Sequence, residues 1–183
     1  AYFEGRVQGI RAVPGEGSKP AVWLLGSSGY SAQVAGLLGL PFAFAHHFSA
    51  RNTLPAIELY RSRFRPSGTL AEPHVMVCAG VVCAPTDDEA RFLFSSNRVS
   101  IRNLRLGAPS RLPSPELAAG VTFSPDESAV IDEHTAGYVV GDPVAVRAGI
   151  VGAGAARTQT VETVAGIAGK ELVGAFAAED DLD

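Results

Sequence analysis

The sequence predicts an α/β protein built from parallel βαβ units. Short apolar runs occur at residues 21–26, 41–45 and 74–84, and each is bounded by glycine, proline or polar turn residues. Such runs suit strands that are buried on both faces, as in a parallel sheet. Each run is followed by a stretch of mixed polar and apolar residues. This repeated alternation of strand and helix indicates consecutive βαβ units.

Composition and charge exclude several classes of protein. The chain has 183 residues and a mass of 19.0 kDa, with 46% hydrophobic and 19% charged residues. These values suit one domain with its own core rather than a disordered chain. The formal charge of -4 lacks the basic excess of a nucleic-acid-binding protein. We therefore expect no nucleic-acid partner. No run reaches the roughly 18 apolar residues that span a bilayer, so we expect no membrane partner either.

Cysteine usage predicts the compartment. The two cysteines, Cys78 and Cys83, share one apolar stretch and form no disulfide framework. We therefore expect a reducing, cytoplasmic setting. Both thiols are predicted to act as small buried hydrophobes, because no neighbouring base is present to lower a thiol pKa.

The first half of the chain is predicted to begin with a ribbon and a helix. Residues 2–13 mix aromatic and branched residues around two glycines, which predicts a short β-ribbon with a turn near Gly5–Gly9. After the first apolar run, Ser31 is a candidate N-cap for a helix that ends at Gly39. A second helix is predicted over residues 53–64, where apolar residues recur at helical spacing.

A third helix and an irregular segment follow the last apolar run. Thr86, with Glu89 three residues later, resembles a capping box and predicts a helix that continues toward Leu104. Residues 105–123 carry three prolines and two glycines. We interpret this segment as an irregular insertion or lid.

The C-terminal part has clear helix starts but no clear strand. A helix is predicted over residues 124–135, because Ser124 precedes a proline at the first helical position. A shorter helix is predicted over residues 141–150. Residues 151–183 are dominated by small residues and end in an acidic tail, so we treat them as an atypical C-terminal segment without a final strand.

Three stretches of the chain carry a family pattern. They are VWLLGSSGYSAQVAGLLGLPFAFAHHFS at residues 22–49, AIELYRSRFRPSGTLAEPHVMVCAGVVCAPTDDEARFL at residues 56–93 and GYVVGDPVAVRAGI at residues 137–150. Together they resemble the luciferase-like monooxygenases, the flavin-dependent group that includes bacterial luciferase and the alkanesulfonate monooxygenases. The similarity covers about residues 1–150 and runs in family order. The motifs are specific in combination rather than singly.

The resemblance implies a TIM barrel, which is a closed cylinder of eight parallel strands. Residues 22–25, 42–45 and 75–83 match its fifth, sixth and seventh strands. We therefore expect a partial (β/α)8 barrel that forms a single domain over residues 1–183, with the N-terminal half of the barrel missing. A complete barrel takes about 250 residues. Residues 151–183 depart from the family pattern, which has an eighth strand and a closing helix there.

A serine-rich turn follows the first of these strands. Ser27, Ser28, Gly29 and Ser31 lie between the strand and the next helix, where backbone N–H groups and hydroxyls suit an anion. In TIM barrels the loops at the C-terminal ends of the strands form the active face. The resemblance implies that this loop binds the phosphate of FMN through Ser28 and Ser31. Without the resemblance, Ser31 is only a helix cap and Ser28 only a turn residue.

Two histidines follow the second strand. Because adjacent residues of an extended segment point to opposite sides, at most one of His46 and His47 is expected to line a pocket. The resemblance implies that His46 faces the flavin, where an imidazole can shuttle a proton. The alternative is a strand-end histidine without a functional role. No metal site is predicted, because no other ligand stands at suitable spacing from this pair.

The resemblance also implies the activity. The family enzymes insert oxygen into a small organic substrate by using reduced FMN and molecular oxygen, and the protein supplies binding and orientation. A deazaflavin is the alternative cofactor, and a flavin reductase is a candidate partner. The catalytic residues are expected in the first half of the barrel, so none is assigned in this chain.

A different hypothesis is a truncated remnant without catalytic activity. Half a barrel leaves the strand at residues 22–25 with an open edge, and such edges pair with other chains. We therefore expect a homodimer and a chain that is inactive by itself. A small doubly wound nucleotide-binding module is the weaker third hypothesis, because the turn GSSGYS lacks the GxGxxG pattern.

Overall fold

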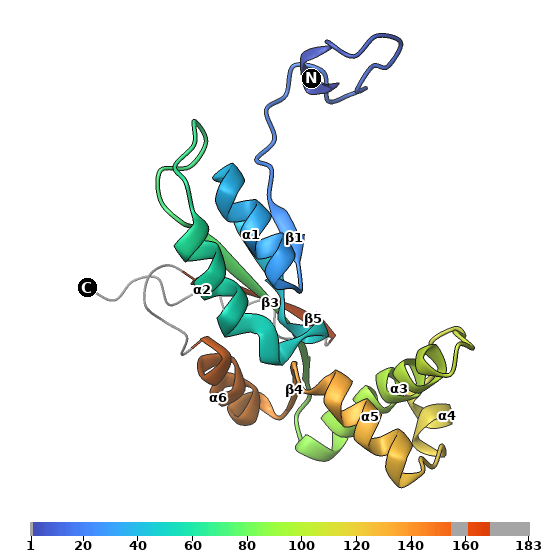
Figure 1. Ribbon diagram of the computed structural model, residues 1–183. Coiled ribbons are helices and arrows are strands. Elements are labelled where there is room, and N and C mark those ends of the chain that lie inside the picture. The colour runs from blue at the N-terminus through green and yellow to red at the C-terminus, as the bar shows by residue number, and fades with distance from the viewer. Residues whose placement is uncertain (1, 155–160, 169–183) are drawn as a thin grey trace.

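A parallel sheet forms the centre of the protein (Figure 1). The computed structural model describes residues 2–154 and 161–168. Within them, β1 pairs with β2, β2 with β3 and β3 with β4, and the fifth strand also pairs with the third. Every pairing is parallel. The strands are β1 (Leu24–Gly26), β2 (Phe42–Ala45), β3 (Val75–Cys83), β4 (Tyr138–Gly141) and β5 (Val161–Ala168).

Helices connect the strands, as parallel neighbours require. The α-helices are α1 (Gly29–Leu38), α2 (Thr53–Arg63), α3 (Asp87–Arg105), α4 (Pro115–Ala119), α5 (Pro125–Thr135) and α6 (Pro143–Gly154). Short 3-10 helices are η1 (Tyr2–Glu4), η2 (His46–Phe48) and η3 (Ala50–Asn52). The strand–helix alternation predicted from the apolar runs is therefore confirmed.

The strand β3 carries neighbours on both of its edges. Its residues Val75–Cys78 pair with β2, and its residues Gly80–Cys83 pair with β4. The strand β5 pairs with Val75–Val82, so it occupies the edge opposite to β2 and β4. As a result, β2 and β4 follow one another along a single edge of β3. The changeover between them lies where β2 ends.

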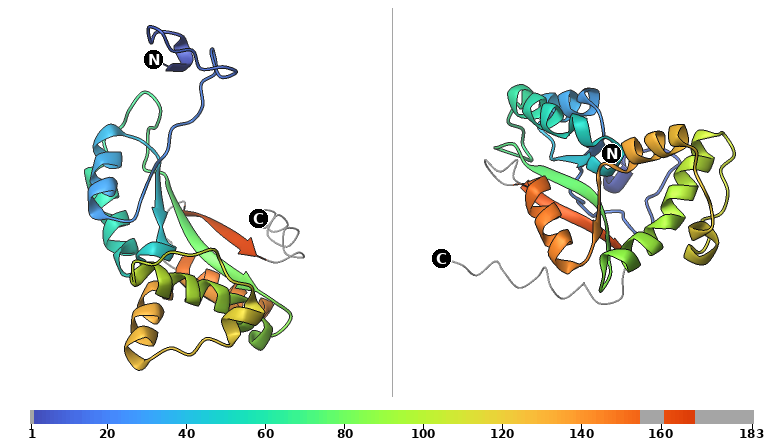
Figure 2. Two further views of the ribbon diagram at one scale, coloured as in Figure 1. Left: turned by 90° about the vertical axis from the view of Figure 1, so that its right-hand side faces the viewer. Right: turned by 90° about the horizontal axis from the view of Figure 1, so that it is seen from below.

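One face of the sheet is covered by helices, and the core lies there. Phe42, Phe44 and Tyr60 are fully buried between the sheet and the helices α1 and α2. Figure 2 shows these two helices as a layer along one side of the strands. Gly36 allows the two helices to approach closely, because an added Cβ would lie 2.8 Å from the carbonyl oxygen of Tyr60. Further along the same face, Val146 of α6 packs against β3.

The opposite face of the sheet carries no such layer over β1. Residues in register across the strands share a face, and this face contains Leu25, Ala43 and Met76. Leu25 is 63% exposed and Met76 is half-buried. Alternate residues of β3 are accordingly buried on the helix-covered face and half-buried on the other. We call this second face the open face.

An arm of helices, residues 87–135, extends from the C-terminal end of β3 (Figure 1). The arm begins at Thr86, whose hydroxyl accepts a hydrogen bond from the Glu89 amide, as the sequence predicted. Its last helix begins at Ser124 in a complete capping box. Within the arm, Arg102 Nε donates to Glu127 Oε1 at 2.6 Å, which ties α3 to α5.

Three predictions for the first half of the chain are wrong. Residues 2–13 form η1 and turns rather than a ribbon, because the positive φ angles of Gly5 and Gly9 break any extended run. The N-cap of α1 is Ser28 rather than Ser31. The first strand is shorter than predicted and is not buried on both faces, since β1 lies at an edge of the described sheet and Leu25 is exposed.

The second half of the chain contains elements that the sequence did not predict. The strand β4 precedes α6, and the helix α4 lies inside the segment 105–123. The strand β5 lies inside the segment 151–183, for which no strand was predicted. The strands β4 and β5 pair with opposite edges of β3. These two segments are extended because they pair with β3, and their composition alone did not predict a strand. The rest of the predicted C-terminal segment, residues 155–160 and 169–183, lies outside the described residues.

Removal of the Tyr60 hydroxyl is expected to destabilise the fold. This hydroxyl donates to the Leu40 carbonyl at 2.9 Å and accepts from the His74 amide at 3.1 Å. Tyr60→Phe should lower the free energy of unfolding by about 1–3 kcal/mol, because both backbone groups lose a partner. Tyr30→Phe is the control, since Tyr30 is 79% exposed and its change should stay within about 0.5 kcal/mol. Urea denaturation measures both, and equal losses would contradict the prediction.

Candidate functional site

Segments that follow the strands meet at the C-terminal edge of the sheet. The turn of residues 27–28 follows β1, and η2 follows β2. The register places Gly26 opposite Phe44, so both segments leave the sheet at nearly the same level. In parallel α/β folds, ligands bind outside this edge. The side chains of these segments therefore form the candidate site.

The serine turn is held together by its own hydroxyl groups. Ser31 Oγ donates to the Ser28 carbonyl at 2.9 Å. The Ser31 side chain also packs under Gly26, where an added Cβ would lie 2.1 Å from the Ser31 hydroxyl oxygen. Ser28 is exposed and takes the extended N-cap conformation without a side-chain cap bond. The Ser31 proton is thus used inside the turn, whereas the Ser28 hydroxyl has no hydrogen bond within the described residues.

His46 points toward α2 rather than standing free. Its Nδ1 lies 2.8 Å from Oγ1 of Thr53, the buried first residue of that helix. Burial lowers the pKa of His46 below its usual value of 6.5, and the adjacent His47 lowers it further. The neutral imidazole is therefore the favoured form in the folded protein.

His47 leaves the sheet in a different direction. The two histidines lie in the 3-10 helix η2, so the predicted extended segment with opposite side chains is wrong. His47 Nδ1 lies 3.1 Å from the carbonyl oxygen of Cys78. That carbonyl belongs to β3 at the changeover from β2 to β4. The imidazole of His47 therefore bonds a backbone carbonyl of the last residue of β3 that pairs with β2.

The chain passes very close to η2 just before β4 begins. Gly137 precedes this strand, and an added Cβ would lie 2.4 Å from the His46 carbonyl oxygen and 2.8 Å from the His47 Cα. Only glycine fits such an approach. The next residue, Tyr138, lies over Gly80, where an added Cβ would lie 2.4 Å from the tyrosine ring. Two glycines thus bring the Tyr138 ring next to His47 on the open face.

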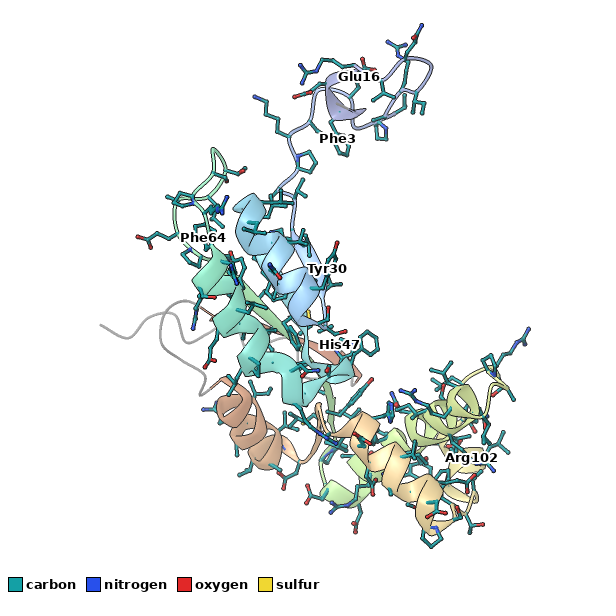
Figure 3. The ribbon with its side chains drawn as sticks, in the orientation of Figure 1. Phe3, Glu16, Tyr30, His47, Phe64 and Arg102 are labelled. Carbon is teal, nitrogen blue, oxygen red and sulfur yellow. The ribbon has the colours of Figure 1, made fainter. Side chains whose placement is uncertain are left out.

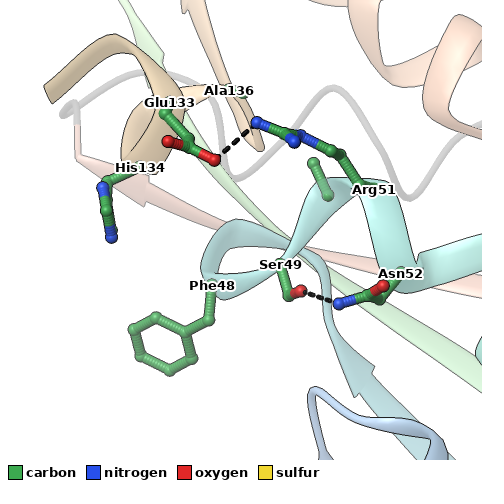
Figure 4. Close-up of a pocket in the computed structure, with 8 residues that line it drawn as sticks. Phe48, Ser49, Arg51, Asn52, Glu133, His134 and Ala136 are labelled. Carbon is green, nitrogen blue, oxygen red and sulfur yellow. Dashed lines mark hydrogen bonds and ion pairs between the residues drawn. The ribbon is translucent and has the colours of Figure 1, made fainter. Parts of the chain in front are cut away.

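A polar cavity of ≈ 280 Å³ adjoins η2 (Figure 4). It lies between η3 and the end of α5. Arg51 Nη2 donates to Glu133 Oε1 at 2.5 Å across it, which joins the loop after β2 to the arm. Asn52 Nδ2 donates to Ser49 Oγ within the loop. Other lining residues are Phe48, Ala50, His134 and Ala136.

The remaining cysteine and metal candidates add no chemistry to this edge. Burial raises the pKa of the Cys83 thiol, and Asp142 raises it further, so the thiol stays protonated. No group of three or more His, Cys, Asp or Glu that could hold a metal occurs among the described residues. None of the helices in the described part of the chain is long and apolar enough to cross a bilayer.

Comparison with known proteins places the chain in a family. The family model described as luciferase-like monooxygenase matches residues 1–166. A luciferase-like monooxygenase of Escherichia coli K12 is 44% identical over 141 residues, which is 77% of this chain and 42% of that protein. The protein YvbT of Bacillus subtilis strain 168 is 46% identical over 150 residues, which is 80% of this chain and 45% of YvbT. The chain therefore belongs to the luciferase-like monooxygenase family.

Solved structures agree with this assignment. The structure of apo-MsnO8 matches with a TM-score of 0.66 and 30% identity, over 87% of this chain and 49% of that chain. Flavoprotein 390 matches with a TM-score of 0.55 and 13% identity, over 79% of this chain and 56% of that chain, and so shares the fold alone. The chain thus spans less than half the length of the curated relatives named above.

The sequence predicted site residues in the serine turn and the histidine pair, and Tyr138 was not among them. The structure brings Tyr138 to His47 and leaves His46 bonded to Thr53. A signal was available, because Gly137 followed by an aromatic residue and a short branched run is typical of a strand that begins at a close approach. The flavin-binding roles of Ser27, Ser28, Gly29, Ser31 and His46 stay predictions.

Gly137→Ala is expected to disturb η2. The new methyl group would overlap the His46 carbonyl and the His47 Cα, so the free energy of unfolding should fall by about 1–3 kcal/mol. Gly68→Ala is the matched control, because an added Cβ at Gly68 has no atom within 4 Å. Its change should stay within about 0.5 kcal/mol. Chemical denaturation measures both, and a Gly137 variant as stable as the control would refute the close approach.

The stability of the protein is expected to fall as the solution becomes acidic. The pKa of His46 is lowered in the folded state, so the unfolded state binds the proton more readily. This contribution is fully present above the usual pKa of 6.5 and is lost as the pH falls below it. His46→Gln should therefore lose less stability than the wild type between about pH 7 and about pH 5.5. Urea titrations at both pH values test this, and parallel losses would contradict it.

Proposed function

We propose that the chain carries part of a flavin-dependent monooxygenase site, in which reduced FMN and molecular oxygen oxidise a small organic substrate. The observation that carries the proposal is the serine turn after β1 in a chain of the luciferase-like monooxygenase family. The turn lies at the C-terminal edge of a parallel sheet, where barrels of this type build their active sites.

The chemistry of the turn fits a phosphate group. The first amide groups of α1, from Gly29 onward, lack acceptors within the helix, and the helix dipole favours an anion at this end. Ser28 is exposed beside them with an uncommitted hydroxyl. We assign direct phosphate contact to Ser28 and the Gly29 amide, with Ser27 at the flank. Ser31 fixes the turn through its bond to the Ser28 carbonyl.

The rest of the edge supports binding and orientation. Bound reduced flavin would supply the electrons that activate oxygen. We assign His46 to the flavin through Nε2, because Thr53 occupies only its Nδ1. The open face, with Leu25 and Met76, provides apolar surface that excludes water when it is covered. A deazaflavin in place of FMN is the alternative cofactor.

Catalysis would need residues from outside this chain. The chain spans 42–45% of the length of its curated relatives, and we propose that it supplies the fifth to seventh strands of their barrel. Groups from the first half would complete the site, so the chain alone would bind cofactor without turnover. A flavin reductase would supply reduced FMN in the cytoplasm. The alternative is an inactive half-barrel, favoured by the exposed edge at β1.

Ser28→Ala is expected to weaken FMN binding. Loss of one hydrogen bond to a charged phosphate should raise the Kd about tenfold or more. Ser62→Ala is the matched control, because the Ser62 hydroxyl donates to the Leu59 carbonyl on the exposed side of α2. Flavin fluorescence titration measures both variants. Riboflavin, which lacks the phosphate, should bind the Ser28 variant and the wild type equally, and a tenfold loss for riboflavin as well would refute the phosphate role.

The open edge of β1 is expected to hold two copies of the chain together. An unpaired strand edge beside an exposed Leu25 favours edge-to-edge pairing. Leu25→Lys should convert a dimer to a monomer, because a charged side chain would be desolvated at the contact. Leu104→Lys is the control, since Leu104 is 61% exposed at the end of α3. Sedimentation equilibrium measures the oligomeric state of each variant. A monomeric wild-type chain would contradict the predicted dimer.

A further inference from the structure

A wall of aromatic rings stands on the open face beside the changeover from β2 to β4. The ring centroids of His47 and Phe48 lie 4.2 Å apart, and those of His47 and Tyr138 lie 6.2 Å apart at 76°. Phe94 of the arm backs Tyr138 at 5.2 Å. Figure 3 labels His47 where the chain leaves β2. Three elements that are distant in sequence thus contribute to one apolar surface, which we call the aromatic wall.

The hydrogen bond to Cys78 fixes the tautomer of His47. A carbonyl oxygen only accepts, so the Nδ1 atom 3.1 Å from it must carry the proton. In the neutral imidazole, Nε2 is then a hydrogen-bond acceptor. Among the described residues, no partner lies within hydrogen-bond distance of this nitrogen. The Nε2 atom of His47 is therefore an unused hydrogen-bond acceptor at the aromatic wall.

Tyr138 presents a second unused polar group beside it. Its hydroxyl has no hydrogen bond within the described part of the chain. The ring is held over Gly80 by the close packing there, and Phe94 contacts it from the arm. The ring position is therefore set by packing rather than by its hydroxyl. An aromatic surface that carries a hydrogen-bond acceptor and a hydroxyl suits a flat ligand with a polar substituent.

We propose that His47 and Tyr138 recognise the organic substrate as a planar ring that bears a hydroxyl group. The ring packs on the aromatic wall, and its hydroxyl donates to His47 Nε2. The Tyr138 hydroxyl lies at the margin to bond a second polar group. This inference deepens the proposed function and rests on it, since it names the substrate class of the same edge of the sheet. His47 is a substrate-binding residue here, and no proton transfer is assigned to it.

The wild-type chain tests the tautomer first. Nitrogen NMR of labelled histidine distinguishes a protonated Nδ1 from a protonated Nε2, and we expect the Nδ1–H form for His47. Addition of 2-naphthol, a planar ring with one hydroxyl, should shift the Nε2 signal. Naphthalene, which lacks the hydroxyl, and n-decanol, which lacks the ring, should shift it little. An Nε2–H tautomer, or equal shifts with all three compounds, overturns the proposal.

Substitutions test the affinity. His47→Phe keeps a flat ring and removes the acceptor, so 2-naphthol binding should weaken about tenfold while naphthalene binding is retained. His47→Gln, which restores an acceptor, should recover part of the loss. His134→Gln is the matched control, because His134 lines the neighbouring polar cavity and bonds the Val130 carbonyl at 2.7 Å. A control loss as large as that of His47→Phe would place the probe in that cavity and reject the proposal.

Failure of this inference and failure of the proposed function give different results. A chain that binds FMN but shows no hydroxyl-dependent 2-naphthol effect at His47 keeps the flavin site and loses the substrate class. A chain that shows the 2-naphthol effect but binds no FMN keeps the ring-binding wall and loses the flavin function. Tyr138→Phe tests the second polar group: a naphthalene diol should bind this variant severalfold more weakly than it binds the wild type, because its second hydroxyl loses a partner, and equal binding would remove Tyr138 from the site.

Discussion

The shared edge of β3 is the constraint on which the site depends. Because β5 takes one edge of this strand, β2 and β4 must divide the other between them. The chain therefore turns away from the sheet at His46, before β4 arrives, and Gly137 passes within a distance that only glycine permits. The backbone carbonyl of Cys78 at this changeover is bonded by His47. The site is a consequence of how two short strands fit along one longer strand.

The two faces of the sheet serve different purposes. Burial of Phe42, Phe44 and Tyr60 against α1 and α2 gives the chain its core. The open face leaves Leu25 and Met76 without such a layer, although both are apolar. Apolar surface of this kind is favourable only when it is covered.

Some polar groups of the C-terminal edge form hydrogen bonds within the protein, and others do not. The Ser31 hydroxyl is used within its own turn, and His46 is bonded to Thr53. The Ser28 hydroxyl and the Nε2 atom of His47 have no such partner among the described residues. The Ser31 hydroxyl and the Nδ1 atom of His46 therefore stabilise the loops, whereas the Ser28 hydroxyl and the Nε2 atom of His47 can bond a ligand.

The sequence alone determined the strand–helix alternation, the helix starts at Thr86 and Ser124, and membership of the family, because apolar periodicity, capping and motif order are local properties. Only the tertiary structure decided which strand forms an edge, where β4 and β5 lie, and that His47 rather than His46 joins Tyr138. These features depend on contacts between residues far apart in sequence, which composition and spacing do not encode.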